Sequence, residues 1–338
     1  MQSWEWGEFK KKMGWQVRRI GLVRVDQLIA GAQVLFRPIP ILPLTIGYIP
    51  KGPIIDLADR QAVQSLFEAL HTISHHHRSV FVKIEPNILD DDDQTHTCLK
   101  ENGWRPSAQT NHPRCTIILD LTQGEKALFS GLRKKTRRLI RCAQREGVQI
   151  VQGDEVDLDE FYHVVSATAE IKEIKIHDRS FYRQGWQAFQ DTSAVNLFLA
   201  KYQDETVAAK MVFIFRDTSL HFWGGTSKLG REVYASYLIQ WEAIRWAVAC
   251  GLKRSDLWGI PDEIAALLRA GETIPQDRCD GLWGVYIFKR GFGGHIESYV
   301  GAYDYVYHPA LYWMLMKILG RSRSLDAASS WLERFSGD

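Results

Sequence analysis

Alternating and β-branched apolar positions dominate the first fifty residues of the chain. Pro and Gly divide them into three stretches, at Val17–Val25, Ala32–Ile39 and Leu44–Ile49. This pattern predicts a meander of strands. The apolar spacing then becomes helical around Val63, Leu66, Phe67 and Leu70, with Asp56 or Asp59 as the N-cap. Ser79–Glu85 alternates again and predicts the next strand.

The second half of the chain repeats this order of elements without repeating the sequence. A strand at Thr116–Leu121 precedes a basic helix near Glu125–Glu146 and an acidic helix near Leu158–Glu170. Further strands, joined by polar turns, follow at Val195–Tyr202, Val207–Phe215 and Ser219–Trp223. A long helix over Tyr234–Cys250, closed by Gly251, leads to a strand at Ser255–Ile260. We therefore predict two similar α+β units.

Length and composition agree with two globular units. The 338 residues exceed what one hydrophobic core usually organises. With 45% apolar and 24% charged residues, the composition excludes disordered, collagen-like and coiled-coil proteins. The 12 tryptophans are unusual, and such large rings fill cores and line clefts for bulky ligands.

No targeting or membrane segment is evident in the sequence. The chain starts without an apolar stretch behind a basic segment, and its best apolar run, Leu311–Met316, ends at Lys317. The five cysteines form no CxxC pair, which favours free thiols in a reducing compartment. We expect a soluble, cytoplasmic protein.

The net charge of +2 conceals a strongly basic block. Eight basic residues and no acidic residue lie between Lys126 and Arg145. On a helix, the apolar residues of this block share one face and leave the basic residues Lys134, Arg137, Arg138 and Arg141 on the other. That face suits nucleic acid or another phosphate ligand. A solvated amphipathic face is the alternative.

A second candidate is the segment Leu282–Gly294, in which Lys289 lies between aromatic residues and a glycine-rich turn. Such a lysine can present its ammonium to a phosphate or a developing oxyanion. The residues by themselves favour a strand that ends in a β-turn with an ordinary surface lysine.

Other motifs point to no metal or nucleophile. His75–His77 lacks the spacing of a metal site and indicates a polar connection, and Asp90–Asp93 indicates a solvated loop. The signatures of serine hydrolases, zincins and P-loop proteins do not occur.

Several segments, in this order and spacing, resemble the Fem-type aminoacyltransferases (FemABX) that build peptidoglycan cross-bridges. The similar segments are Gln2–Lys10, Pro50–Asp56, Lys83–Pro86, Arg133–Arg141, Glu146–Val148, Tyr234–Ile244 and Ile287–Gly293. They cover most of the chain.

The resemblance implies two GNAT-like (acyl-CoA N-acyltransferase-like) subdomains sharing a cleft, comprising residues 1–113 plus 300–338, and residues 114–299. It also implies transfer of an amino acid from aminoacyl-tRNA to the stem-peptide amine of a peptidoglycan precursor, either lipid II or UDP-MurNAc-pentapeptide. Family members need no metal or CoA, so we predict no cofactor. We expect a monomer.

The resemblance also assigns site residues. Lys289 matches a lysine suggested to stabilise charge at the reacting ester, and Phe288 is its stacking neighbour. Lys10 matches a lysine that contacts the precursor's diphosphate. Further candidates for substrate binding are Glu85, Arg179, the weaker match His177, Tyr234 and Tyr237. The basic helix is our own inference for tRNA, with Lys134, Arg137, Arg138 and Arg141 as phosphate contacts.

The sequence departs from the family pattern at three places. His221–Trp223 stands where some members carry tyrosines, and Glu85 stands where one branch has an aspartate. Between Trp258 and Gly281 there is no long coiled-coil insertion, so the arm that some members use for tRNA is missing. The transferred amino acid and the acceptor therefore stay open.

Two other function classes compete with this interpretation. One is a CoA-dependent N-acyltransferase, for which Leu229–Ser236 has few glycines to hold a pyrophosphate. The other is a non-catalytic RNA- or polymer-binding protein of the same fold.

The segment Tyr305–Leu319 allows two interpretations: transient contact with the inner membrane face, or a helix packed on the first subdomain. Its short length favours the second interpretation.

Overall fold

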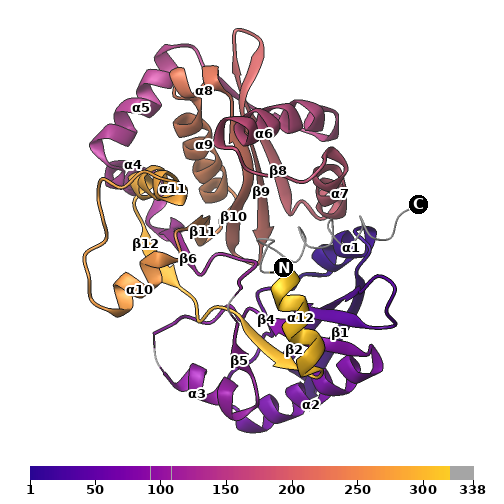
Figure 1. Ribbon diagram of the computed structural model, residues 1–338. Helices are drawn as coiled ribbons and strands as arrows, with labels where there is room; N and C mark the ends of the chain where they lie inside the picture. The colour runs from indigo at the N-terminus through magenta and orange to yellow at the C-terminus, as the bar shows by residue number, and fades with distance from the viewer. Residues whose placement is uncertain (92, 108, 320–338) are drawn as a thin grey trace. The chain divides into compact units, whose positions relative to one another are not determined.

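The computed structural model describes residues 1–91, 93–107 and 109–319, and the chain divides into two compact units. Unit 1 consists of Met1–Arg114 and the chain from Ser298 onward, whereas unit 2 is the continuous stretch Cys115–Glu297. Each unit has one mixed sheet flanked by helices (Figure 1). The predicted α+β class is confirmed.

The sheet of unit 1 has six strands in the order β1-β2-β3-β4-β13-β5. Only β3 and β4 run parallel. β13 comes from the C-terminal part of the chain and lies between β4 and β5 (Figure 1). The strands span Gln16–Arg24 (β1), Gln27–Pro38 (β2), Thr45–Ile49 (β3), Ser79–Ile84 (β4), Arg105–Pro106 (β5) and Tyr303–Val306 (β13).

Helices cover both faces of this sheet. They are α1 (Trp4–Lys12), α2 (Arg60–His76), α3 (Gln94–Glu101) and α12 (Pro309–Leu319). The Asp59 side chain caps α2 by accepting a hydrogen bond from the Ala62 backbone N–H at 3.0 Å, as predicted. The apolar stripe of α2 is buried against β2 and β4, and Leu315 of α12 packs against Phe81 on the other face.

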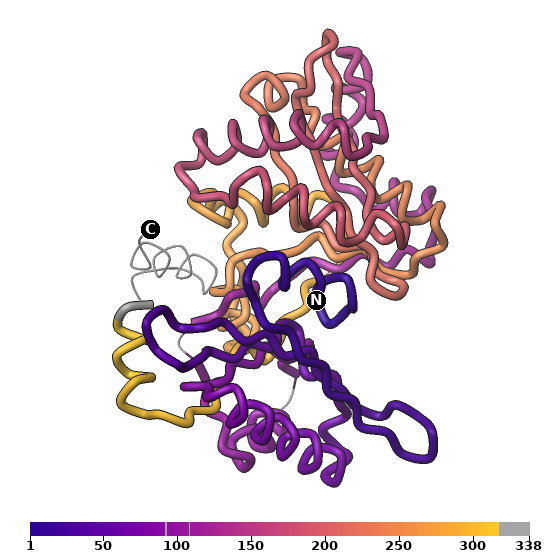
Figure 2. Tube along the Cα trace, turned by 90° about the vertical axis from the view of Figure 1, so that its right-hand side faces the viewer, coloured from indigo at the N-terminus to yellow at the C-terminus, as the bar shows by residue number. Residues whose placement is uncertain are grey.

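The β1–β2 hairpin extends beyond the rest of unit 1 (indigo in Figure 2). Its end carries exposed apolar side chains, since Val25 is 90% and Leu28 71% accessible. The strands lie within one residue or so of the predicted meander, except that β2 begins earlier, at Gln27.

The sheet of unit 2 has seven strands in the order β12-β6-β11-β10-β9-β8-β7. β10 and β11 run parallel. The strands span Cys115–Asp120 (β6), Gln149–Gly153 (β7), Val195–Tyr202 (β8), Glu205–Phe215 (β9), Thr218–Thr226 (β10), Arg254–Ile260 (β11) and His295–Ser298 (β12).

Two groups of helices cover the faces of the unit 2 sheet. Figure 1 shows α6 and α7 on one face and α5, α9 and α11 on the other. The helices are α4 (Gly124–Gly131), α5 (Lys134–Arg145), α6 (Leu158–Lys172), α7 (Arg179–Phe189), α8 (Lys228–Glu232), α9 (Ala235–Ala249), α10 (Glu263–Arg269) and α11 (Leu282–Lys289). Gly251, with φ of +72°, ends α9 as predicted.

Three predicted elements are wrong in detail. The basic stretch is two helices, because Leu132 and Arg133 are extended: the Leu132 side chain is buried, and the Arg133 N–H donates to the Gly291 carbonyl at 3.0 Å. The Lys289 segment is a helix, since α11 and a 3₁₀ turn replace the strand and β-turn that the residues favoured. Tyr305 lies in β13, so only the later part of Tyr305–Leu319 is helical.

Helix lengths bear on two further predictions. The longest helix among residues 1–91, 93–107 and 109–319 is α2, with 17 residues, so this part of the chain contains no coiled-coil arm. In the same ranges no helix has the length and apolar character needed to cross a bilayer.

Candidate active site

Unit 2 contains a wedge where β10 and β11 separate. The two strands pair only from Thr218 with Arg254 to Leu220 with Asp256. Beyond this point the registers of both strands shift against their outer neighbours, and Trp258 adopts a positive φ of +66°. A non-glycine residue in this conformation is uncommon. The backbone carbonyls of Trp258 and Gly259 therefore accept hydrogen bonds from a side chain.

That side chain is Lys289, the last residue of α11. Its Nζ donates to the carbonyl oxygens of Trp258 at 2.9 Å and Gly259 at 2.7 Å. Burial of the ammonium, together with the charges of Lys210 and Lys172 and against the opposing effect of Asp256, lowers the pKa of Lys289 to about 7. An ammonium has three donors, so one N–H is left for a ligand.

Aromatic side chains surround the lysine segment. The Phe288 ring lies 5.0 Å from Tyr237 of α9 and 5.2 Å from Phe292, both in edge-on contacts. The structure thus brings three predicted site residues, Lys289, Phe288 and Tyr237, to one place. Burial raises the pKa of Tyr237, which stays a neutral hydroxyl.

A buried histidine forms the floor of the wedge. His221 Nε2 lies 2.9 Å from the Ser255 hydroxyl and 3.2 Å from that of Ser219, and the amide of Gln240 lies 3.1 Å from Nδ1. Burial, followed by the charges of Lys210 and Lys289, lowers the pKa of His221 well below its usual value. His221 is therefore a neutral, fixed group.

The basic helix α5 begins beside the lysine segment. The Arg133 N–H bonds to the Gly291 carbonyl, and a Cβ on Gly291 would lie 2.4 Å from Thr136 Oγ1 of α5. The helix and the turn after Lys289 approach closely here, and the missing Cβ of Gly291 allows this approach. The basic surface and Lys289 therefore belong to one continuous region of unit 2.

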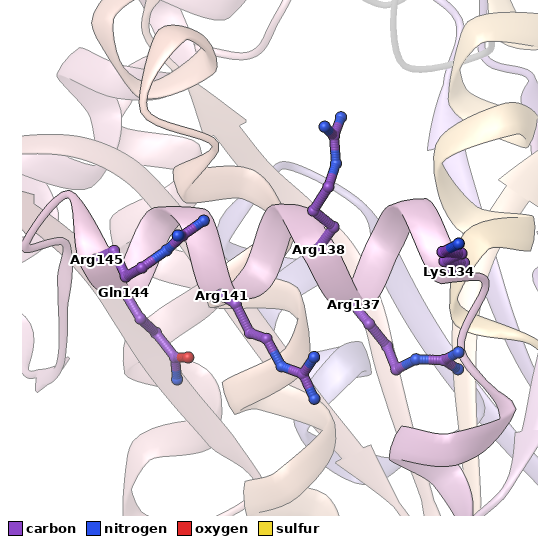
Figure 3. Close-up of a pocket in the computed structure, with 6 residues that line it drawn as sticks. All are labelled: Lys134, Arg137, Arg138, Arg141, Gln144 and Arg145. Atoms are coloured by element: carbon purple, nitrogen blue, oxygen red, sulfur yellow. The ribbon is translucent and has the colours of Figure 1, made fainter.

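The exposed side of α5 forms an open hollow of about 840 Å³ (Figure 3). It is lined by Lys134, Arg137, Arg138, Arg141, Gln144 and Arg145. Figure 3 shows the Arg137 and Arg141 side chains pointing to one side of the helix axis and Arg138 to the other, and all four predicted residues line the same exposed hollow. Arg137 bonds to the Ser130 carbonyl, and Arg141 lies over the Phe129 ring.

The predicted residues of unit 1 gather around His112. Lys10 is 4% exposed, with its Nζ 5.5 Å from the centres of the Trp6 and Phe9 rings. Burial, then Lys51 and Lys10, lower the pKa of His112 far below its usual value. Lys10 therefore supplies a positive charge close to this histidine.

Glu85 lies beside His112, with its Oε2 4.0 Å from His112 Nε2. Its carboxylate accepts hydrogen bonds from the Tyr48 hydroxyl and from the Asn111 N–H, the latter at 2.5 Å. Burial raises the pKa of Glu85, although these hydrogen bonds oppose the rise. Unit 1 thus holds cations and a carboxyl group in one place.

His177, Arg179 and Tyr234 are exposed and held by local contacts in unit 2. The His177 ring stacks on Phe181 at 3.7 Å, and Arg179 forms an ion pair with Asp159. Tyr234 is the N-cap of α9 and has a φ of +58°. Their assignment to substrate stays a prediction.

The sequence also missed residues of the site. Sequence patterns do not single out Lys210, His221 or Tyr48, although Lys210 is visible as one charge in the apolar stretch Val207–Val212. The buried His112 gave no signal of this kind. Among residues 1–91, 93–107 and 109–319, no group of three or more His, Cys, Asp or Glu side chains could hold a metal.

Sequence comparison relates the chain to a known protein family. A sequence model of the FemAB family matches residues 1–203 and 195–319. A lipid II:glycine glycyltransferase of Staphylococcus aureus strain MRSA252 is 20% identical over 395 aligned residues, covering 95% of this chain and 91% of the relative. Another from Staphylococcus aureus is 26% identical over 62% of this chain and 52% of its own length.

Solved structures agree on the fold. The crystal structure of FemX superposes with a TM-score of 0.82 at 20% identity, covering 93% of this chain and 94% of that one. A tandem GNAT protein of clavulanic acid biosynthesis gives 0.52 at 9% identity, covering 86% and 82%. The match of the family model over nearly the whole of the described chain makes this protein a transferase of the FemAB family.

Proposed function

We propose that this protein transfers an amino acid from aminoacyl-tRNA to the stem-peptide amine of the peptidoglycan precursor lipid II. The observation that carries the proposal is Lys289, desolvated and fixed by two carbonyls, beside a basic helix. The similarity to lipid II:glycine glycyltransferases supports the acceptor.

The chemistry needs few catalytic groups. The acceptor amine attacks the ester carbonyl, a C–N bond forms, and the bond to the ribose oxygen breaks as the proton of the amine passes to that oxygen. Negative charge develops on the carbonyl oxygen during this step. The free N–H of Lys289 donates to that oxygen, which is most effective in a desolvated site. Phe288 and Tyr237 hold the lysine segment in place.

The basic helix supplies the affinity for tRNA. Among the described residues, none of the eight basic side chains between Lys126 and Arg145 forms an ion pair with a carboxylate. The helix starts without a side-chain cap and with no acidic residue in its first turn. Uncompensated charge and the positive end of the helix both favour phosphate. Lys134 and Arg138 project freely, whereas Arg137 also holds the end of α4.

The acceptor side is proposed for unit 1 and for the start of α7. The resemblance assigns Lys10 to the diphosphate of the precursor, with Glu85 as a further substrate contact and Arg179 or His177 as a second diphosphate contact. The buried positive charge of Lys10 beside Glu85 supports the first two assignments. Tyr234, at the exposed end of α9, stays a substrate-binding candidate.

A specific observation disfavours the CoA alternative. In GNAT enzymes, backbone amides before a helix bind the pyrophosphate. Here the corresponding amides are used by α8: the N–H groups of Gly230 and Arg231 bond to Ser227, and that of Val233 bonds to Leu229. They are therefore not free to hold CoA.

Transfer of a labelled amino acid from charged tRNA tests the proposal, with lipid II and UDP-MurNAc-pentapeptide as separate acceptors. Lys289→Met should lower kcat by about 10²- to 10³-fold, the usual loss when an oxyanion donor is removed. Lys201→Met is the matched control, because that lysine pairs with Glu160 outside the site. No transfer by the wild type with any charged tRNA, or turnover of acetyl-CoA instead, would refute the proposal.

A further inference from the structure

Lys210 is a charged residue in an otherwise apolar strand. It lies in β9 between Ala208 and Val212, which belong to the apolar cluster that α9 covers. Its cross-strand partner on β10 is Gly224. Because cross-strand partners share a face, the absent side chain of Gly224 leaves the lysine uncovered on this side.

The Lys210 ammonium has no polar partner among the described residues. Within the part of the chain that the structure describes, it makes no hydrogen bond and no ion pair, although its side chain is only partly exposed. Burial lowers the pKa of Lys210 to about 8. Buried charges are normally paired, so an unpaired ammonium here calls for an explanation.

Lys210 lies beside the wedge that holds Lys289. Its charge depresses the pKa of both Lys289 and His221, which places it within electrostatic range of each. The strand register agrees, because Gly224 and Gly259 both lie a few residues beyond the last paired rung of β10 and β11. Other charged groups facing Lys289 are Asp256 and Lys172.

Asp256, the carboxylate whose charge acts on Lys289, forms no ion pair with Lys210 among the described residues. Asp256 Oδ1 accepts hydrogen bonds from the Thr116 hydroxyl and from the Trp258 N–H, the latter at 2.7 Å. Lys289 is likewise engaged with its two carbonyls. The site therefore lacks one negative charge, which a ligand would supply.

We propose that Lys210 binds the phosphate of the 3′-terminal nucleotide of the aminoacyl-tRNA, next to the ester that Lys289 faces. The identification of this anion as a tRNA phosphate rests on the proposed function. We choose the tRNA over the precursor because α5 joins its basic surface directly to the Lys289 segment at Arg133 and Gly291. Lys210 would then fix the ester relative to Lys289.

The first test needs no catalysis. Lysine ε-carbon NMR signals of the whole protein are followed during titration with inorganic phosphate, with chloride at equal ionic strength as the comparison. We expect a saturable shift of the Lys210 signal that persists in Lys201→Met, and loss of phosphate binding at this site in Lys210→Met. An absent shift, or an equal one with chloride, would overturn the site whether or not the protein transfers amino acids.

The second test identifies the source of the anion. Lys210→Met should raise KM for charged tRNA by about tenfold or more and leave KM for lipid II unchanged, and Lys210→Arg should restore part of the loss. Lys210→Met removes an unpaired charge from an apolar strand and should melt at or above the temperature of the wild type, and Lys210→Arg, which keeps the charge, should melt near it. A rise in KM for lipid II instead would show that the anion belongs to the precursor, which contradicts the assignment to tRNA.

Discussion

Lys83 of unit 1 and the lysines of the unit 2 wedge are buried in opposite ways. In unit 1, Lys83 of β4 is 1% exposed and its Nζ lies 2.8 Å from the carboxylate of Asp304, which is fully buried. It also donates to the Gln109 carbonyl at 3.0 Å. In unit 2, Lys289 has only carbonyl partners, and Lys210 makes no polar contact with the described residues.

This difference separates structural lysines from functional ones. The Lys83 ammonium is satisfied by the fold itself, so nothing is left for a ligand. Lys289 and Lys210 keep donors free, at the cost of desolvated positive charge that the protein does not neutralise. Such unpaired, perturbed groups beside a wedge are typical of functional sites.

The largest expected effect is on stability. Lys83→Met leaves Asp304 buried without its cation and should lower the free energy of unfolding by about 3–5 kcal/mol. Lys210→Met removes an unpaired charge and should keep or raise that free energy. Urea unfolding at pH 7 measures both. Equal destabilisation of the two variants would contradict the distinction between a paired Lys83 and an unpaired Lys210.

A smaller effect concerns pH. The pKa of Lys210 falls from 10.5 to about 8 on folding, so between these values the unfolded state binds more protons. The charged Lys210 ammonium therefore destabilises the folded state fully below pH 8, and this destabilisation decreases as the pH rises toward 10.5. Within this window, the free energy of unfolding of the wild type should increase relative to that of Lys210→Met by up to about 1.4 kcal/mol per pH unit.

Guanidinium unfolding of both proteins at several values between pH 7 and pH 10 tests this prediction. Removal of the Lys210 charge also raises the pKa of Lys289, so the Lys289 titration is followed in parallel by its ε-carbon NMR signal. A constant difference between the two proteins across this range would contradict the assigned burial of Lys210.

The smallest expected effect concerns exposed arginines, which can also be divided into unpaired and paired side chains. Arg138 of α5 has no ion-pair partner among the described residues, whereas Arg245 of α9 pairs with Glu125 and Glu242. Arg138→Gln should weaken tRNA binding severalfold and reduce the salt dependence of log affinity by about 1. Arg245→Gln should leave both unchanged. Equal effects, measured by filter binding over a range of salt, would argue against α5 as the tRNA surface.

Local patterns were enough to predict most strands and helices. The alternation of β1 to β3 and the capping of α2 depend on neighbouring residues, which the sequence displays directly. The break at Leu132 and Arg133 could not be predicted in this way, because it depends on the Gly291 carbonyl far along the chain. Likewise, the helical state of Phe288 and Lys289 depends on tertiary contacts with α9 and β11.

The residues of the candidate site are likewise only partly predictable from the sequence. Lys83 and Lys210 look alike in sequence, each being one charge in an apolar strand. What separates them is Asp304, which is distant from Lys83 in sequence and adjacent only in the sheet. The resemblance to a family suggested Lys289, but the unpaired state of Lys210 needed three-dimensional contacts.

The position of β13 has a consequence for synthesis of the protein. Asp304 lies opposite Lys83 on the rung between β4 and β13, and the ribosome makes all of unit 2 between these two residues. During that time β4 has an open edge and Lys83 has no carboxylate partner, and exposed edges of this kind invite pairing with other chains. Unit 2 is continuous, so it can complete its sheet first. The half emerging first from the ribosome is therefore the last to finish folding, and a nascent chain halted before Tyr303 would carry one finished unit and one aggregation-prone sheet.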